Sequence, residues 1–455
     1  MTSIDAALRR TIGEVRAGLP DFDFVGPGGQ LRVELGPTLV DRVRVDLLSP
    51  GVLRLQSLGI VTTDGLRPDA LAGRSTVVAS SWSAGRQEAF RPSRLLDPDH
   101  RDGPMIQTQH DDRPWVEVTF DEPVEVAAVQ LRAIDARAAV EDRDIRVQVG
   151  SPGAALVTVH DARERRELLH TLLSEAAAQV PPELRSEFAM LVGPLEMTIA
   201  GDYRDARAAM KQVAKKVSDG ARRTFARVVS DDVLLGRSLE WTAHGPTRSF
   251  RFWSEQEKVD YIRFTVSVAE ALRELTPHVC FGYGAALAVV RDGDLIPHDD
   301  DLDLIVAFEP HEAATLPEAH ARVEEFLRAR GFAVRGDFFG HRHVAPATGG
   351  KSVDVFSALF EGDRIAWYPG TRGALNRSTM FPTGEGQLLG VRCPLPADPV
   401  AYLETVYGPG WSTPDPGFKH TWRKRDFADQ TVAPAPSEPE PERRGWLARV
   451  LQSWR

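Results

Sequence analysis

The stretch that decides the fold of this chain covers residues 278–306 and reads HVCFGYGAALAVVRDGDLIPHDDDLDLIV. Its apolar start, residues 279–281, predicts a short buried strand, and the following Gly-Tyr-Gly predicts a tight turn. Residues 285–291 then predict a helix that ends at Gly293. Beyond Pro297, the apolar and β-branched run 302–306 predicts a second strand. A strand, a glycine turn and a helix in this order allow a backbone to approach a phosphate group.

Four carboxylates, at positions 299, 300, 301 and 303, lie between the proline turn and the second strand. Alternation along an extended chain places Asp299, Asp301 and Asp303 on one side and Asp300 on the other. Two like charges about 4 Å apart repel by roughly 4 kcal/mol at an effective dielectric near 20. The cluster therefore needs a cation or strongly shifted pKa values. Because the ligands would all be oxygens, Mg²⁺ or Mn²⁺ is favoured over zinc.

Two other interpretations of the acidic run are open at this point. A solvated acidic turn is one, since charge runs commonly lie on a wetted surface. A calcium loop of the EF-hand type is the other, because Asp299, Asp301 and Asp303 have the spacing of its first three ligands. The spacing argues against the calcium loop, because its required glycine would be Leu304 and its closing glutamate would be Pro310.

A further carboxylate, Asp354, lies in the strand-like run KSVDVF of residues 351–356. A buried and unpaired carboxylate is costly, so Asp354 is expected to meet a metal, a basic group or a backbone donor. On pattern alone, a position at a strand edge facing water is equally possible.

Two motifs carry a family resemblance: GAAL at residues 284–287 and RDGDLIPHDDDLDL at residues 291–304. Together they resemble the signature of the LicD family, which includes bacterial phosphocholine transferases and, more distantly, fukutin and fukutin-related protein. This family is a branch of the nucleotidyltransferase superfamily. The resemblance implies transfer of a phosphocholine or phospho-alditol group from a CDP-activated donor to a glycan. Ordered matches from Phe381 to Pro414 resemble the closing family pattern, so the resemblance spans residues 253–422.

The resemblance also implies roles for individual residues. Asp301 and Asp303 would be paired metal-binding carboxylates for Mg²⁺ or Mn²⁺, and Asp354 would be the third. Asp299 would assist them, and either Asp299 or Asp354 would accept the proton of the acceptor hydroxyl. The donor-binding positions would be Gly284, Ala285, Arg291, His298 and Asp300. This chain departs from the family at Ala285, where Thr or Ser is usual, and at His298, where Trp is usual.

Length and composition indicate the number of domains, the class of protein and the compartment. At 455 residues the chain is expected to form two or three domains. Its net charge of −10 argues against a protein that coats nucleic acid. Two cysteines without a CxxC pattern favour a reducing compartment. The start of the chain lacks an apolar signal-type core, so we expect a cytoplasmic protein, peripheral at most to the inner face of the membrane.

Periodicity suggests an organisation in five parts. Residues 1–157 alternate as short strands and predict an antiparallel β-sandwich. In it, WVEVTF at 115–120, PV at 123–124 and VQLR at 129–132 resemble a discoidin-type, galactose-binding-like jelly roll, which would bind a glycan or brace the enzyme. Residues 158–250 predict a helical connector, with helices at 163–178, 183–192, 204–217 and 222–229. Residues 251–428 would form a mixed α/β, nucleotidyltransferase-like domain.

The end of the chain changes composition. Residues 429–442 predict a Pro/Glu-rich linker. Residues 443–455 predict an amphipathic helix with Trp446, Leu447, Val450, Leu451 and Trp454 on one face. Such a helix would contact an anionic membrane surface weakly or lie in a groove of a partner protein, and the pattern does not separate the two.

The function expected from these residues is metal-dependent phosphotransfer from a CDP-linked donor to a sugar hydroxyl of a cell-surface glycan or glycolipid precursor, such as a teichoic acid or lipopolysaccharide. Three alternatives stay open. One is a nucleotidyltransferase that moves the nucleotide itself onto a small molecule. Another is a glycan-binding protein whose transferase domain is degenerate, as Ala285 allows. The third is a scaffold recruited through its tail.

Overall fold

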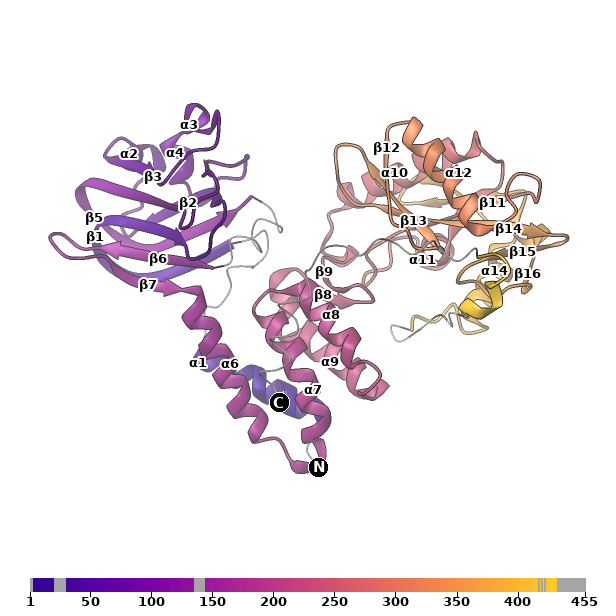
Figure 1. Ribbon diagram of the computed structural model, residues 1–455, viewed down its shortest axis with the longest axis horizontal. Helices are drawn as coiled ribbons and strands as arrows, with labels where there is room; N and C mark the ends of the chain where they lie inside the picture. The colour runs from indigo at the N-terminus through magenta and orange to yellow at the C-terminus, as the bar shows by residue number, and fades with distance from the viewer. Residues whose placement is uncertain are drawn as a thin grey trace. The chain divides into compact units, whose positions relative to one another are not determined.

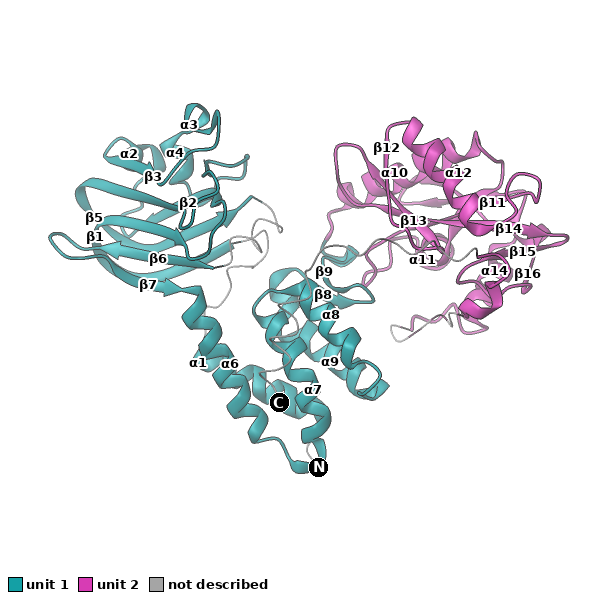
Figure 2. Cartoon of the chain, viewed as in Figure 1, with its two compact units in different colours: residues 1–252 teal, residues 253–455 magenta. Residues whose placement is uncertain are grey.

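The computed structural model describes residues 3–19, 30–134, 144–415, 418, 420 and 423–431. The predicted linker at 429–442 lies mostly outside these residues, and the predicted tail helix at 443–455 lies wholly outside them. The chain divides into two compact units, residues 1–252 and 253–455 (Figure 1 and Figure 2). Among the described residues, no helix combines the length and the apolar character that crossing a membrane requires.

The first unit contains an antiparallel sheet whose seven described strands run in the order β4-β2-β5-β1-β6-β7, with β3 beside β5. The strands are β1 (Gln30–Leu47), β2 (Arg54–Thr62), β3 (Ser75–Ala79), β4 (Ile106–Gln107), β5 (Trp115–Ala133), β6 (Ile145–Gly150) and β7 (Val157–Asp161). Short helices α2 (Pro68–Ala72), α3 (Arg86–Ala89) and α4 (Pro92–Leu95) join them. The antiparallel character predicted for this region is confirmed, and its jelly-roll connectivity stays a prediction.

Two long strands replace pairs of short strands that the sequence suggests. The runs at 115–120 and 129–132 both belong to β5, and β1 is likewise one strand of 18 residues. The pairing of β1 with β5 shifts register between Glu34 and Thr38 and again between Val40 and Arg42. Pro37 and Pro123 fall at these irregular places, where a residue without an N–H costs the ladder no hydrogen bond. Both halves of the sheet contribute to one buried apolar core.

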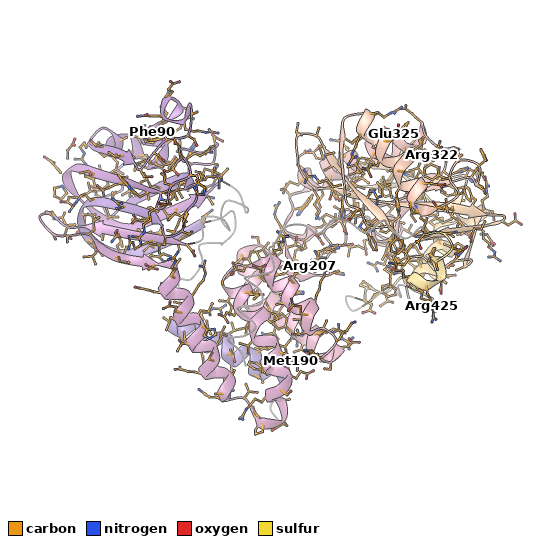
Figure 3. All side chains as sticks on the ribbon, in the orientation of Figure 1. Phe90, Met190, Arg207, Arg322, Glu325 and Arg425 are labelled. Atoms are coloured by element: carbon orange, nitrogen blue, oxygen red, sulfur yellow. The ribbon has the colours of Figure 1, made fainter. Side chains whose placement is uncertain are left out.

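The rest of the first unit is helical, with α1 (Ile4–Gly18), α6 (Ala162–Ala178), α7 (Pro182–Ile199), α8 (Tyr203–Val213) and α9 (Asp219–Val229). Although α1 lies in the range predicted to be sandwich, it buries Leu8, Ile12 and Val15 in a core shared with the later helices. Its apolar residues recur at helical spacing, so they need a helical partner face rather than a sheet face. Met190, labelled in Figure 3, packs against the same core. The unit closes with a π-helical turn (Ser230–Leu234) and the hairpin β8 (Glu240–Thr242) and β9 (Gly245–Thr247).

The second unit is built on a mixed sheet, with described strands in the order β10-β11-β14-β13-β12 and with β15 and β16 continuing from β14. The strands are β10 (Val279–Gly282), β11 (Asp303–Phe308), β12 (Phe332–Arg335), β13 (His341–Pro346), β14 (Val353–Glu361), β15 (Arg364–Trp367) and β16 (Leu375–Asn376). Only β11 and β14 are paired in parallel among the described strands. This arrangement agrees with the mixed α/β character predicted for the region.

Helices and a hairpin complete the second unit. They are α10 (Glu255–Arg273), α11 (Tyr283–Leu287), α12 (Leu316–Ala329), α13 (Arg377–Met380) and α14 (Pro399–Tyr407), with β17 (Gly384–Leu388) and β18 (Val391–Leu395). A capping box begins α10, since the side chain of Ser254 accepts from the N–H of Glu257 and the Glu257 carboxylate accepts from the N–H of Ser254. The predicted helix after the glycine turn ends at Gly293, whose φ is 69°.

Candidate active site

The glycine turn at the end of β10 is held by buried aromatic residues. Tyr283 has a φ of 40°, a left-handed conformation that is uncommon outside glycine. Its N–H donates to the hydroxyl of Tyr402 at 2.8 Å, and its own hydroxyl accepts from Nε1 of Trp367 at 2.6 Å. Residues in such conformations persist where the surroundings fix them, and they concentrate at functional sites.

A carboxylate lies close against Gly284. A Cβ atom added to Gly284 would lie 2.7 Å from Oδ2 of Asp299. Oδ1 of the same carboxylate accepts from the N–H of Asp300 at 2.9 Å. The turn therefore brings α11 and the acidic run together, and the close approach that the sequence indicates is made to a carboxylate of the chain.

Strand register brings the distant carboxylates into one row. Asp303 is the first residue of β11 and pairs in parallel with Asp354 on β14. Asp354 in turn pairs in antiparallel with His343 on β13. Residues paired across neighbouring strands point to the same face of a sheet. Three strands thus contribute one residue each to a single line across the sheet.

Asp301 completes a set of three carboxylates. One oxygen from each of Asp301, Asp303 and Asp354 lies within 4.8 Å of the others. The acidic run enters β11 only at Asp303, yet Leu302 is buried and Asp301 faces the carboxylate group, as alternation predicts. The oxygen-only donor set fits a hard divalent cation such as Mg²⁺ or Mn²⁺.

The carboxylates of the cluster would be stabilised in their ionised form by an added positive charge. Burial, followed by the charge of Asp301, raises the pKa of Asp299 well above its usual range. Burial, followed by the charges of Asp301 and Asp354, does the same to the pKa of Asp303. Within the described part of the chain, Asp303 forms no ion pair with lysine or arginine. A cation bound here would remove the cost that these shifts express.

Two tyrosines outside the predicted set hold and border the cluster. The hydroxyl of Tyr261 on α10 donates to the carbonyl of Ser352 at 2.6 Å and accepts from the N–H of Leu302 at 3.1 Å. It thereby fixes the chain just before β14 and just before β11. Burial and then the charges of Asp303 and Asp299 raise the pKa of Tyr407 well above its usual range. No local pattern indicates these contacts, because they join residues far apart in the sequence.

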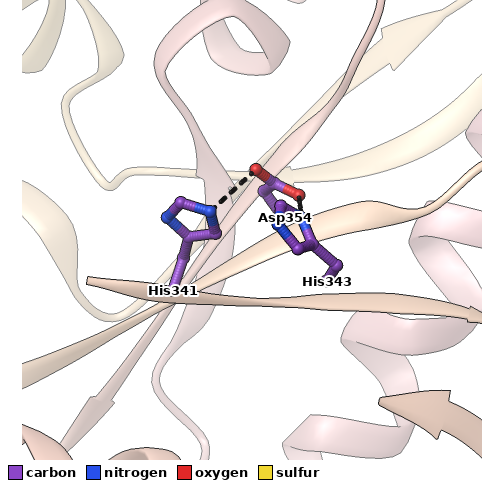
Figure 4. Close-up of side chains that lie close together, drawn as sticks. All are labelled: His341, His343 and Asp354. Carbon is purple, nitrogen blue, oxygen red and sulfur yellow. Dashed lines mark hydrogen bonds and ion pairs between the residues drawn. The ribbon is translucent and has the colours of Figure 1, made fainter. Parts of the chain in front are cut away.

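Two histidines on β13 are the main residues that the sequence reasoning missed. Nδ1 of His343 lies 2.5 Å from Oδ1 of Asp354, and Nε2 of His341 lies 3.4 Å from Oδ2 (Figure 4). The alternation His-Arg-His in a strand beside Asp354 would have been a signal, since it places both imidazoles on one face. Strand order had to be known before that face could be matched with Asp354.

The predicted donor-binding residues have varied surroundings. Ala285 is fully buried, and His298 lies partly buried in the turn with Pro297. Asp300 is buried and forms an ion pair with Lys351 at 3.0 Å. Arg291 binds both carboxylate oxygens of Asp292 and donates to the carbonyl of Trp411 at 3.3 Å. Asp300 and Arg291 therefore have partners within the protein, and their contacts with a donor stay a prediction.

A comparison with known protein families gives a match that includes this site. The sequence model of the LicD/FKTN/FKRP nucleotidyltransferase domain matches residues 278–398. The chain carries a LicD-family domain. The predicted family is confirmed over this range, which contains the glycine turn, the acidic run, Asp354 and the two histidines. The match to this family supports a transferase role. The predicted closing motif beyond residue 398 lies outside the matched range.

Other comparisons add little to the LicD match. A comparison with curated proteins finds no match. Among solved structures, the chain is similar to the crystal structure of ANT(2")-Ia in complex with adenylyl-2"-tobramycin, with 18% sequence identity and a TM-score of 0.22. That similarity covers 29% of this chain and 68% of the other.

Proposed function

We propose that this chain is a metal-dependent phosphotransferase that moves a phosphocholine or phospho-alditol group from a CDP-activated donor to a sugar hydroxyl. The observation that carries the proposal is the convergence of Asp301, Asp303 and Asp354 within 4.8 Å, inside the range matched by the LicD model. Phosphoryl transfer depends mainly on positioning and charge neutralisation, which such a group supplies.

The metal requirement follows from the donor set. Asp301, Asp303 and Asp354 would hold Mg²⁺ or Mn²⁺, and the bound cation would offset the charge of the donor pyrophosphate and of the departing CMP. The residues fit this role because the raised pKa values of Asp303 and Asp299 mark a cluster that favours an added positive charge.

In the reaction, the acceptor hydroxyl oxygen forms a bond to the phosphorus of the transferred group. The bond between that phosphorus and the bridging oxygen of the pyrophosphate breaks, so CMP leaves. The acceptor proton needs a base, and Asp299 is the better of the two predicted candidates. Both oxygens of Asp354 face histidines, whereas Asp299 lies against the glycine turn and outside the set of three proposed metal ligands.

The acceptor and the location are part of the same proposal. We infer that the acceptor is a cell-surface glycan or glycolipid precursor at the cytoplasmic face of the membrane, by analogy with the LicD family. The antiparallel sheet of the first unit would bind or orient that glycan. In this unit, the ring of Trp82 packs on that of Phe90 with centroids 5.0 Å apart, and such aromatic rings could contact a sugar.

The test is release of CMP from a panel of CDP-linked donors, with Mg²⁺ or Mn²⁺ and with glycan acceptors. We expect metal-dependent release in the wild type and loss of release in Asp301→Asn and Asp303→Asn. Donors labelled separately in the base and in the head group separate phosphotransfer from nucleotidyl transfer. Label from the base appearing in the product, or no turnover of any donor, would overturn the proposal.

A further inference from the structure

Asp354 belongs to two groups of ligand atoms. One is the carboxylate set with Asp301 and Asp303, and the other joins Asp354 to His341 and His343, again with one atom from each residue within 4.8 Å of the others. The second group offers two imidazole nitrogens and one carboxylate oxygen. This donor set is chemically different from the oxygen-only set beside it.

Pairing between β13 and β14 holds the second group of ligand atoms in place. His343 is paired with Asp354 across the β13–β14 ladder, and His341 is paired with Phe356. The intervening Arg342 is directed elsewhere, since its Nε donates to Glu324 at 3.1 Å. Both imidazoles therefore face Asp354, whose two oxygens point one to each ring (Figure 4).

The surroundings resemble those of an open metal centre. The ring of His341 packs against Phe356 and Phe338, with centroids 4.9 and 5.3 Å apart, so its orientation is fixed by apolar contacts. The side chain of His341 is 14% exposed and that of Asp354 is 10% exposed, whereas His343 is 46% exposed. Two ligands are thus buried and rigid, while the third lies at the surface and leaves a path for an ion.

We propose that His341, His343 and Asp354 form a second cation site, selective for a borderline transition-metal ion such as Zn²⁺, and that Asp354 is shared with the Mg²⁺ or Mn²⁺ site. Imidazole ligands suit zinc, whereas carboxylates alone suit magnesium and manganese. Three protein ligands leave a coordination position for water or a substrate oxygen. This site is independent of which donor the enzyme uses.

A purely positioning role for the histidines is the competing explanation. In that case His341 and His343 would only orient Asp354 for the cation held by the carboxylates, and zinc would not bind them. Loss of such outer-shell partners typically weakens metal binding by about 10–100-fold. The two explanations therefore differ in which metal responds to which substitution.

The experiment uses the full chain, stripped with a chelator and dialysed against Zn²⁺ alone, with no donor present. Bound zinc is measured by mass spectrometry of the metal content, and affinity is measured by titration calorimetry. We expect one zinc per chain in the wild type, in Asp301→Asn and in Asp303→Asn. His341→Asn and His343→Asn should each weaken zinc binding by more than about 100-fold, beyond the loss expected for an outer-shell partner.

Control variants and a spectroscopic readout keep the result interpretable. His311 is an exposed histidine outside the site, so His311→Asn should bind zinc as the wild type does. Co²⁺ bound in place of zinc should give visible d–d absorption that disappears in both site variants, while thermal unfolding confirms that each variant is folded. Mn²⁺ binding, followed by electron paramagnetic resonance, should instead depend mainly on Asp301 and Asp303.

Two outcomes would overturn the zinc site. One is a wild type that binds no zinc while it still binds Mn²⁺, and the other is zinc that stays bound in both histidine variants. Neither outcome depends on catalytic turnover, so failure of this inference and failure of the proposed phosphotransfer are distinguishable.

Discussion

Both sheets of this protein contain carboxylates, but the charges that surround these carboxylates differ in sign. In the first unit, Asp46 is buried on β1 and lies between two arginines, with Nε of Arg44 at 3.0 Å and Nη2 of Arg146 at 3.4 Å. In the second unit, Asp303 begins β11 beside Asp354 and Asp301, and burial with these charges raises its pKa. One carboxylate is neutralised within the sheet, and the other lies among like charges.

The difference separates a carboxylate that is neutralised within its sheet from one that we propose to bind a cation. Asp46 is paired with Arg146 across β1 and β6, so its charge is met by register alone. The register of β11 and β14 instead pairs Asp303 with another carboxylate, Asp354, and no lysine or arginine among the described residues forms an ion pair with Asp303. We propose that this cost is retained because it gives the site an attraction for a cation.

The largest expected effect is on turnover. Asp303→Asn should lower metal-dependent CMP release by on the order of 100- to 1000-fold, because a catalytic cation supplies several kcal/mol of transition-state stabilisation. Asp46→Asn is the matched control and should leave turnover unchanged. Steady-state kinetics at saturating metal measure both. Equal losses in the two variants would contradict the distinction between the sheets.

In the metal-free protein, the order of the two variants should be reversed: Asp46→Asn should lower stability, and Asp303→Asn should not. Asp46→Asn leaves Arg44 and Arg146 without their shared carboxylate, so we expect a loss of about 1–3 kcal/mol in the free energy of unfolding. Asp303→Asn removes one of several like charges and should raise the midpoint of thermal unfolding. Both are measured after chelator treatment. A lowered midpoint in Asp303→Asn would show that its charge is compensated in a way that the ion pairs do not reveal.

The pH dependence of stability should sharpen the same contrast. Because the pKa values of Asp303 and Asp299 are raised in the folded state, the protonated carboxyls favour folding. The metal-free second unit should therefore lose stability as pH rises through these folded pKa values, by up to about 1.4 kcal/mol per pH unit for each group. Below the ordinary carboxyl pKa the carboxyls are protonated in both the folded and the unfolded state, so stability does not change with pH there on their account.

Added Mn²⁺ should flatten this dependence, because the cation favours the ionised carboxylates. Unfolding midpoints across a pH series, with and without Mn²⁺, test the prediction. A metal-free protein that becomes more stable as pH rises through this range would refute the assigned direction.

The smallest expected effect concerns Asp300. Like Asp46, it is a buried carboxylate paired with a basic side chain, although it lies within the acidic run. Lys351→Gln removes the 3.0 Å ion pair to this buried carboxylate, and the lysine side chain is 33% exposed. We expect a loss of at most about 1 kcal/mol in stability, as for partly exposed pairs, and unchanged Mn²⁺ affinity. Calorimetric titration measures the affinity. A large loss of Mn²⁺ binding would place Asp300 with the metal-binding carboxylates.

Much of the fold was predictable because it depends on local periodicity. Alternating runs predicted the strands of the first unit, although the bulges that merge them into β1 and β5 depend on pairing partners. The helices α6 to α9 lie in the range predicted to be helical, and the capping box at Ser254 marked the start of α10. The helix α1 was missed, because its apolar face needs the packing partners contributed by residues 162–234.

The sequence by itself determined the acidic run, the glycine turn and the strand that contains Asp354, because each depends on neighbouring residues and on the LicD motif. Only the tertiary structure decided which charges meet. Strand order and register place Asp303, Asp354 and His343 in one row. Packing of segments outside the strands brings Lys351 to Asp300 and Arg291 to Trp411. These partners lie up to 120 residues apart, and a local pattern specifies the face of a strand without specifying what lies opposite.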